Sequence, residues 1–262
     1  MAPADYLHSM FSLEGKTAII TGATGGLGKS IALAFTKAGA AIVSLELPND
    51  PNSAALASAI EEAGGPAVRK FACDVSKGAA VRATYAEVWK AGIVPDILVN
   101  CAGTSIRRAC EDTSDEELDL LFELNAKSTY ISCQEFGREL LRLGRPGKII
   151  NIASVTSFQA NRNTSAYAAT KGAVMQMTKG FSNEWVSKGI QVNAISPGYM
   201  KTPLTELYYT NKEASDYLMN RVPAGRWGQP EDLDTAALFL ASPMNSFTSG
   251  VSITVDGGFC GK

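Results

Sequence analysis

Thr17-Ala-Ile-Ile-Thr-Gly-Ala-Thr-Gly-Gly-Leu-Gly28 is the stretch of sequence that decides the fold. A short apolar run is followed by a glycine-rich turn, and a helical pattern then continues to Ala38. Gly22 permits a tight turn, Gly26 lets the backbone approach a pyrophosphate, and Gly28 lets helix and strand pack closely. The free N–H groups at the start of the helix favour a phosphate. This strand–turn–helix context predicts a dinucleotide-binding site.

Short β-branched runs alternate with longer helical patterns on both sides of that turn. The predicted strands cover 17–21, 41–45, 67–73, 96–100, 148–152, 190–195 and 251–255, and the predicted helices cover 27–38, 54–63, 79–90, 115–143 with a break near Asn125, 166–187 and 230–240. The strands are mostly apolar rather than alternating, which is typical of strands covered on both faces. The pattern predicts a single doubly wound α/β domain of the Rossmann type, with a seven-stranded parallel sheet and helices on both faces.

Two segments fall outside this alternation. Residues 1–12 are predicted to form a loose N-terminal tail, which leaves 13–262 as one dinucleotide-binding catalytic domain. Residues 198–228 interrupt the rhythm between the sixth strand and the next helix with aromatic and turn-forming residues. An insertion at the carboxyl end of a strand lies where open α/β sheets bind ligands. We therefore expect a substrate lid over 198–228.

The composition excludes several classes of protein. The chain has 262 residues, of which 45% are hydrophobic and 19% charged, as in ordinary globular domains. A net charge of −2 predicts neither a nucleic-acid partner nor an anionic membrane surface. No apolar run is long enough to span a membrane, and the first ten residues have no secretory pattern. The five scattered cysteines lack metal or disulfide spacing, so we expect free thiols, no metal site and a cytoplasmic protein.

Two acidic residues end predicted strands on the side of the glycine turn. Glu46 lies about 20 residues beyond the turn, where a carboxylate can accept hydrogen bonds from ribose hydroxyls and repel a 2′-phosphate. It therefore favours NAD over NADP, although NADP stays possible, and a solvated charge is the alternative interpretation. Asp74 is expected near the adenine, or as a cap of the following helix, and both roles are compatible.

Three polar residues suit proton transfer to a carbonyl oxygen. Tyr167 and Lys171 are four apart in a helical pattern and therefore share one face, while Ser154 follows the fifth strand. A free tyrosine has a pKa near 10, about three units too high for a base at neutral pH. A nearby ammonium and a cationic nicotinamide are expected to stabilise the phenolate. An ordinary surface pair is the alternative for Tyr167 and Lys171.

These motifs, in this order, are similar to those of the short-chain dehydrogenase/reductase family over nearly the whole chain. The matching residues are Thr21-Gly22-x-x-x-Gly26-x-Gly28, Asp74, Asn100-Cys-Ala-Gly103, Asn125, Ser154, Tyr167-x-x-x-Lys171 and Pro197-Gly198. The ordered set is far more specific than any of its members. Cys101 departs from the second Asn that is usual in the family.

The resemblance implies a role for each matching residue. Tyr167 is the expected acid/base and Ser154 the group that polarises the substrate oxygen. Lys171 is expected to bind the nicotinamide ribose and lower the tyrosine pKa, and Asn125 to interrupt its helix and hold a water that links Lys171 to solvent. The implied cofactor-binding residues are Gly22, Thr24, Gly26, Leu27, Gly28, Glu46, Asp74, Val75, Asn100, Ala102, Gly103, Tyr167, Lys171, Pro197, Gly198 and Thr202. The family also implies a homotetramer.

Further segments resemble the subgroup of 2-deoxy-D-gluconate 3-dehydrogenases and 2-dehydro-3-deoxy-D-gluconate 5-dehydrogenases. They include Ser157-Phe-Gln159, Pro197-Gly-Tyr-Met200 and Pro223-Ala-Gly-Arg-Trp-Gly228. An arginine fork binds a sugar-acid carboxylate bidentately, which gives Arg107 and Arg108 a physical role. The pair lies one residue further from Gly103 than in those relatives, and an exposed basic pair is the alternative. The predicted substrate residues are Arg107, Arg108, Ser154, Gln159 and Tyr199.

The sequence therefore predicts an NAD(P)-dependent oxidoreductase that interconverts a secondary alcohol and a ketone by hydride transfer, on a sugar acid or polyol. Two alternatives stay open. One is a ketone reductase of secondary metabolism that uses NADPH. The other is a cofactor-binding protein without turnover, which predicts the loss of a catalytic residue.

Overall fold

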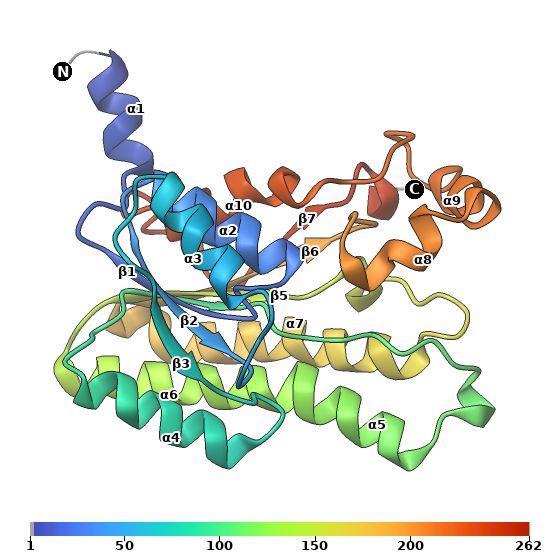
Figure 1. The fold of residues 1–262 in the computed structure, drawn as a ribbon, viewed down its shortest axis with the longest axis horizontal. Helices are drawn as coiled ribbons and strands as arrows, with labels where there is room; N and C mark the ends of the chain where they lie inside the picture. The colour runs from blue at the N-terminus through green and yellow to red at the C-terminus, as the bar shows by residue number, and fades with distance from the viewer. Residues whose placement is uncertain (1–2, 262) are drawn as a thin grey trace.

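Seven parallel strands form one sheet in the computed structural model, which describes residues 3–261 (Figure 1). The strands are β1 (Thr17–Thr21), β2 (Ala41–Glu46), β3 (Arg69–Ala72), β4 (Ile97–Asn100), β5 (Gly147–Ile152), β6 (Ile190–Pro197) and β7 (Ser252–Val255). Their order is β3-β2-β1-β4-β5-β6-β7, so the sheet winds outward in both directions from the β1–β4 pair. The predicted fold is confirmed.

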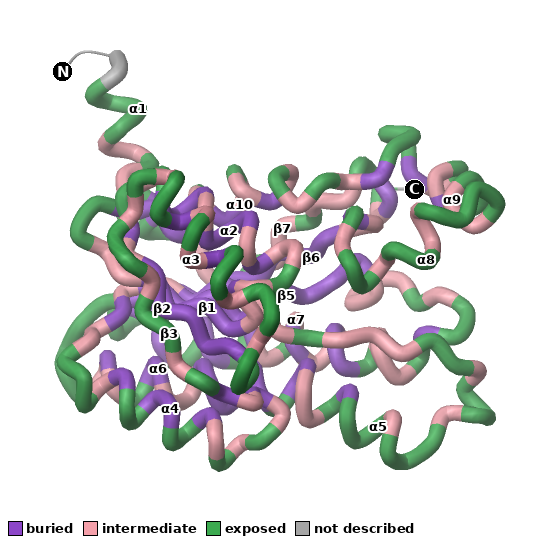
Figure 2. Tube along the Cα trace, in the orientation of Figure 1, coloured by how far each residue is buried: buried purple, intermediate pink, exposed green. Residues whose placement is uncertain are grey.

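Helices cover both faces of this sheet. One face packs against α2 (Gly26–Lys37), α3 (Ser53–Glu62) and α10 (Asp234–Ala241), and the other packs against α4 (Gly78–Lys90), α6 (Ser128–Leu143) and α7 (Ser165–Trp185). Because neighbouring side chains on a strand point to opposite faces, Ile20 joins the first apolar cluster and Ile19 the second. Figure 2 shows the central strands as the buried core of the molecule, whereas β3 at the edge of the sheet is largely exposed.

The amino-terminal segment differs from its prediction. Instead of a loose tail, the described part forms the helix α1 (Pro3–Phe11), which projects from the body of the molecule (Figure 1). Ser242 anchors its end by donating a hydrogen bond to the carbonyl of Met10. Tyr6 and Leu7 remain largely exposed, so α1 adds little to the core and its apolar signal in the sequence is weak. Residues 1 and 2 of the predicted tail lie outside the described residues.

The predicted break near Asn125 is a π-helical segment. α5 (Asp115–Leu121) continues through π-helical Phe122–Lys127 into α6 without leaving the helix. At the position where an interruption was predicted, the helix is therefore continuous but wider. Such π-helical turns are rare and are often found at functional sites.

Segment 198–228 leaves the carboxyl end of β6 and returns to α10. It contains a 3₁₀ turn (Pro203–Thr205), α8 (Glu206–Tyr209) and α9 (Lys212–Met219), which lie together at one end of the molecule (Figure 1). Among the described residues, no helix has both the length and the apolar character needed to cross a membrane.

Candidate active site

The glycine turn lies at the carboxyl end of β1, between the two halves of the sheet. A Cβ on Gly22 would lie 2.9 Å from the backbone of Ala102, and a Cβ on Gly28 only 2.1 Å from the Gly22 carbonyl oxygen. Gly22 also has a φ of 67°, which glycine adopts most readily. Close packing therefore requires glycine at both positions, as the sequence analysis expected.

The first turn of α2 leaves its backbone N–H groups available. Its N-cap is Gly25, and no side chain caps the helix. A twelve-residue helix with an open N-terminus at the switch point of a parallel sheet suits a phosphate group. The glycine turn 22–28 and the open N-terminus of α2 together form a cradle that fits a dinucleotide.

Two carboxylates lie beside this cradle. Glu46 ends β2 and is buried, and its carboxylate accepts hydrogen bonds from the hydroxyls of Ser44 and Ser53. The hydroxyl of Thr24, in the turn itself, donates to Asp50 over 2.7 Å. Asp50 was not predicted from the sequence, because it lies in an irregular loop after β2. The two acids make this end of the site negative.

Asp74 and Asn100 form hydrogen bonds with residues of the chain. Asp74 accepts from the backbone N–H and the hydroxyl of Ser76 in the turn before α4. The N-cap of α4 is Lys77 and no side chain caps this helix, so the predicted capping role of Asp74 is wrong. The Asn100 amide donates to Asn151 across β4 and β5, while its buried oxygen has no hydrogen-bond partner among the described residues. Val75 is buried in the apolar cluster on the α4 and α6 face.

The four predicted catalytic residues come together at the carboxyl end of β4 and β5. Ser154 follows β5, and Tyr167 and Lys171 project from the first two turns of α7. The Lys171 Nζ lies 5.9 Å from the centre of the Tyr167 ring and donates a 2.8 Å hydrogen bond to the Ile152 carbonyl.

Asn125 completes this group from the π-helical segment. Its amide donates to the carbonyl of Thr104 and to the hydroxyl of Thr170, while its oxygen accepts from the Thr104 N–H. These bonds tie the loop after β4 to α7. A Cβ on Gly103 would lie 3.0 Å from the Asn125 oxygen and 3.6 Å from the Lys171 Nζ, so this glycine keeps the two groups accessible to each other.

Burial governs the ionisation of the tyrosine–lysine pair. Desolvation raises the pKa of Tyr167, and a hydrogen bond with Ser154 opposes the rise. Desolvation also lowers the pKa of Lys171 to about 8, with an opposing effect from Cys101. In the chain without a nicotinamide, burial disfavours the Tyr167 phenolate more than the hydrogen bond with Ser154 favours it. The expected lowering of the tyrosine pKa, by Lys171 together with a cationic nicotinamide, stays a prediction.

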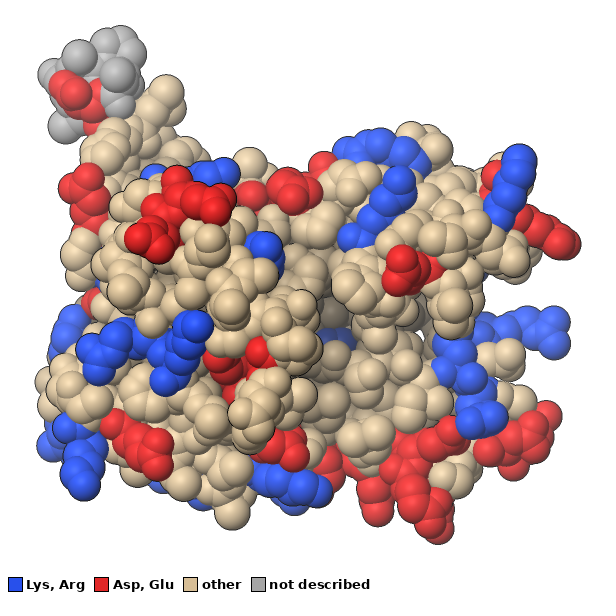
Figure 3. Space-filling model, viewed as in Figure 1, with Lys and Arg blue, Asp and Glu red and all other residues tan. Residues whose placement is uncertain are grey.

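Tyr167 stands in the wall between two cavities. The smaller, of about 120 Å³, carries most of the predicted cofactor contacts of the nicotinamide side, including Leu27, Gly103, Lys171, Pro197 and Thr202. The larger, of about 230 Å³, extends toward the segment 198–228. The residues that line both cavities are Ser154, Tyr167, Gly198, Leu204 and Thr205. Figure 3 shows the molecule hollowed between the part that carries α8 and the part that carries α5.

The larger cavity contains some of the predicted substrate residues and not others. Arg107, Ser154 and Tyr199 line it, and the Arg107 guanidinium lies 4.3 Å from the centre of the Tyr208 ring. Arg108 instead turns outward into an ion pair with Glu117. Gln159 lies outside the cavity wall as well. Consecutive residues of an extended loop point in opposite directions, which explains why only one arginine of the pair faces the cavity.

Several lining residues were not among the predicted substrate residues. Asn161 comes from the loop after β5, Tyr208 and Leu218 from α8 and α9, and Trp227 from the end of the segment 198–228. The aromatic content of that segment indicated its place beside the substrate, and Trp227 also belongs to the Pro223-Ala-Gly-Arg-Trp-Gly228 stretch that resembles the subgroup. Asn161 has no such signal, because its place in the wall depends on how two distant loops meet.

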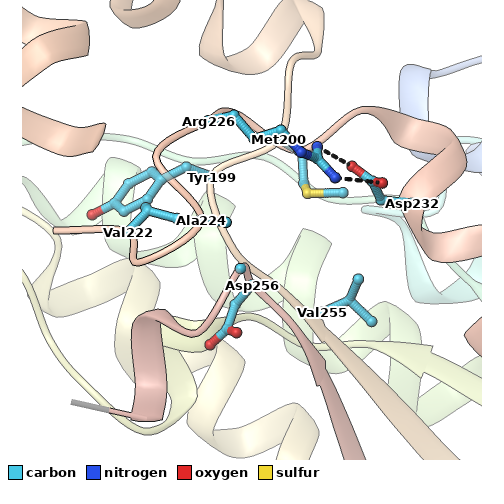
Figure 4. Close-up of a pocket in the computed structure, with 10 residues that line it drawn as sticks. Tyr199, Met200, Val222, Ala224, Arg226, Asp232, Val255 and Asp256 are labelled. Atoms are coloured by element: carbon cyan, nitrogen blue, oxygen red, sulfur yellow. Dashed lines mark hydrogen bonds and ion pairs between the residues drawn. The ribbon is translucent and has the colours of Figure 1, made fainter. Parts of the chain in front are cut away.

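A third cavity, of about 150 Å³, lies behind Tyr199 (Figure 4). Arg226 and Asp232 form an ion pair across one side of it, and Asp256 lies on another side. Tyr199 directs its hydroxyl away from that ion pair. Neither Ser154 nor Tyr167 reaches this cavity, so it is separate from the catalytic group.

Residues 22–260 match the family model described as enoyl-(acyl carrier protein) reductase. The chain belongs to the short-chain dehydrogenase/reductase family. This match spans nearly all of the chain and confirms the family resemblance that was seen in the motifs.

Relatives within this short-chain dehydrogenase/reductase family extend the similarity. The chain is 40% identical to a 2-dehydro-3-deoxy-D-gluconate 5-dehydrogenase of Bacillus subtilis (strain 168), with 98% of this chain and 99% of the relative covered. It is 39% identical to a gluconate 5-dehydrogenase of Gluconobacter oxydans (strain 621H), with 95% and 96% covered. A gluconate 5-dehydrogenase of Burkholderia cenocepacia J2315, solved in complex with NADP and tartrate, is 38% identical with a TM-score of 0.92, and 98% and 99% of the two chains are covered.

Membership of the short-chain dehydrogenase/reductase family confirms the predicted class of activity. The chain is an NAD(P)-dependent oxidoreductase that acts on a CH–OH group. No residue of the predicted catalytic set is missing, so the alternative of a binding protein without turnover loses its support.

Proposed function

We propose that this enzyme interconverts a secondary alcohol and a ketone on a sugar acid or polyol, with Tyr167 as the acid/base. The observation that carries the proposal is the position of Tyr167 and Ser154 in the wall shared by two cavities. A nicotinamide bound on the smaller side would accept or supply the hydride. The substrate would lie on the larger side, against the same two hydroxyls.

The proton movement follows from the geometry of these residues. Ser154 donates a hydrogen bond toward the substrate oxygen and orients it next to Tyr167. The Tyr167 phenolate takes the alcohol proton during oxidation, and the phenol that results returns this proton during reduction. Because burial raises the tyrosine pKa, the phenol keeps its proton at neutral pH and reduction is the direction in which its resting form is ready to act.

Lys171 and Asn125 position the groups that carry out this proton transfer. Lys171 is fixed by the Ile152 carbonyl and places its Nζ beside the Tyr167 ring, where it can also bind a ribose hydroxyl. Asn125 holds the loop after β4 against α7 through Thr104 and Thr170. In the structure the Asn125 amide nitrogen is already used by its hydrogen bonds to Thr104 and Thr170. Its predicted role in holding a water therefore stays a proposal.

We further propose that NAD is the preferred cofactor. Glu46 and Asp50 place two negative charges beside the glycine turn, where a 2′-phosphate would be repelled. The Burkholderia relative was solved with NADP. NADP therefore remains a usable second cofactor in this proposal, and the two acids set the preference.

The proposed assembly is a homotetramer in the cytoplasm. Tyr130 and Leu143 leave apolar surface exposed on α6, and Tyr130 packs against Phe181 of α7. Near β7, Phe247 and Met244 are strongly exposed. Exposed apolar patches of this kind suit contacts between subunits. The five cysteines are all free, as expected in a reducing compartment.

Oxidation of D-gluconate, D-glucitol and a panel of aryl alcohols with NAD and with NADP tests the proposal. Wild-type enzyme should reduce NAD with at least one polyhydroxy substrate. Tyr167→Phe should lower kcat by about 10³-fold or more while the affinity for NADH, measured by fluorescence, stays within about twofold. Full activity of Tyr167→Phe, or turnover of aryl alcohols alone, would contradict the proposal.

A further inference from the structure

Two arginines approach the far end of the larger cavity without a carboxylate partner among residues 3–261. Arg107 lines the cavity, and its guanidinium lies against the Tyr208 ring of α8. Arg221, which follows α9, donates a 2.6 Å hydrogen bond to the amide oxygen of Asn161, another lining residue. Neither arginine forms an ion pair within the described chain, although Arg108 and Arg226 do.

The hydroxyl of Tyr199 is close enough to both arginines for their charges to act on it. It is buried and has no hydrogen-bond partner among the described residues, and the Asn161 amide lies nearby without hydrogen-bonding geometry. Both guanidiniums act on it: desolvation raises the pKa of Tyr199, while Arg221 and Arg107 lower it. A buried donor without an acceptor costs free energy. A ligand oxygen that accepts a hydrogen bond from this hydroxyl would remove that cost.

Arg221 is held rigidly in this position. Asn161 binds one of its nitrogens, and its guanidinium lies 4.9 Å from the centre of the Phe259 ring in the C-terminal segment. Phe259 is buried, so its ring gives the guanidinium a fixed surface to pack against. A guanidinium that is ordered before the ligand arrives loses little freedom on binding.

We propose that Arg107 and the Tyr199 hydroxyl bind the carboxylate of the substrate, and that Arg221 is a positioning residue that adds positive charge and holds Asn161 behind them. This anion site rests on the proposed function and deepens it, because it selects sugar acids over neutral polyols of the same length. Ser154 and Tyr167 line the same cavity, and the reacting carbon of the substrate would lie against them.

A matched pair of ligands tests the charge selectivity. D-gluconate and D-glucitol have the same six-carbon chain and differ in one end group, a carboxylate or a hydroxymethyl. Binding of each is measured by calorimetry with and without NADH, together with KM and kcat. Wild-type enzyme should bind gluconate at least about tenfold more tightly, as expected for charge-assisted hydrogen bonds. Equal binding, or a preference for glucitol, would overturn the anion site.

Substitutions then assign the effect to residues. Arg107→Met and Arg221→Met should each raise KM for gluconate by about 10- to 100-fold with kcat within about threefold, and leave glucitol binding unchanged. Arg221→Lys should recover part of the loss. Arg162→Met is the control, because Arg162 is exposed on the same loop as Asn161 but outside the cavity wall.

The two proposals can fail separately. Gluconate binding that depends on Arg221, without turnover of any alcohol, would leave the anion site standing and refute the proposed reaction. Turnover that is equal for gluconate and glucitol, and that Arg221→Met does not change, would support the proposed reaction and refute the anion site. If Arg221→Met unfolds, as judged by its melting temperature, Arg221→Lys and Arg107→Met decide the question through their KM values for the two ligands.

Discussion

Replacing Lys171 by methionine should stabilise the protein while it removes activity. Burial lowers the pKa of Lys171 from 10.5 to about 8, so folding disfavours the ammonium. Each pKa unit corresponds to about 1.4 kcal/mol, which gives the buried charge a cost of roughly 3 kcal/mol at neutral pH. The variant also loses the hydrogen bond to the Ile152 carbonyl, worth about 1 kcal/mol. A net gain of roughly 2 kcal/mol remains.

The pH dependence identifies the cause of this gain. Below pH 8 the lysine is protonated in both the folded and the unfolded chain, and the full cost is present. Between pH 8 and 10.5 the unfolded chain binds more protons than the folded chain, so the stability of the wild type rises with pH. The advantage of Lys171→Met should therefore shrink above pH 8, vanish near about pH 10 and reverse at higher pH, where only the lost hydrogen bond of about 1 kcal/mol remains.

Urea unfolding of both proteins at pH 7 and at pH 10 measures the effect. Lys148→Met is the matched control, because burial lowers the pKa of Lys148 to about 8 as well, at the opposite end of β5. It should show a smaller gain with the same pH trend and unchanged kcat. A Lys171→Met protein that is less stable than wild type at pH 7, or whose advantage is independent of pH, would refute the reasoning.

Two further variants test the cofactor cradle. Gly28→Ala should lose NADH binding and more than about 2 kcal/mol of stability, because its Cβ would meet the Gly22 carbonyl. Gly180→Ala on α7 is the control, because its Cβ would meet nothing, and this variant should fold like wild type. Calorimetry and urea unfolding check both, and a stable, NADH-binding Gly28→Ala would contradict the packing argument. Glu46→Gln should shift the ratio of kcat/KM for NADP over NAD upward by about tenfold, and an unchanged ratio would remove Glu46 from the cofactor preference.

The central strands of the sheet were predictable from sequence because they are buried on both faces. Runs such as 17–21 and 148–152 have an apolar centre with two consecutive isoleucines, and their limits agree closely with β1 and β5. The helix α1 was not predictable in the same way. Its apolar residues lie on one side of the helix, but Tyr6 and Leu7 remain largely exposed, so the segment lacks the signal of a helix buried in the core.

The site was predictable only where a motif fixes the spacing. Tyr167 and Lys171 are one turn apart on α7, so their proximity follows from the helix itself. Arg221 and Asn161 are 60 residues apart, and only the folded chain shows that they meet. Arg108 was predicted to bind a carboxylate of the substrate because of its residue type. In the folded chain its guanidinium instead forms an ion pair with Glu117.

The π-helical turn at Phe122–Lys127 makes the active site sensitive to chain length as well as to residue type. A π-helical turn holds one more residue than an α-helical turn. Deleting a single residue there would restore the ordinary α-helical period and move Asn125 out of the widened turn. Asn125 could then no longer reach Thr104 and Thr170 together. A change of chain length between α5 and α6 is therefore expected to disturb the loop that holds Gly103, even when every catalytic side chain is kept.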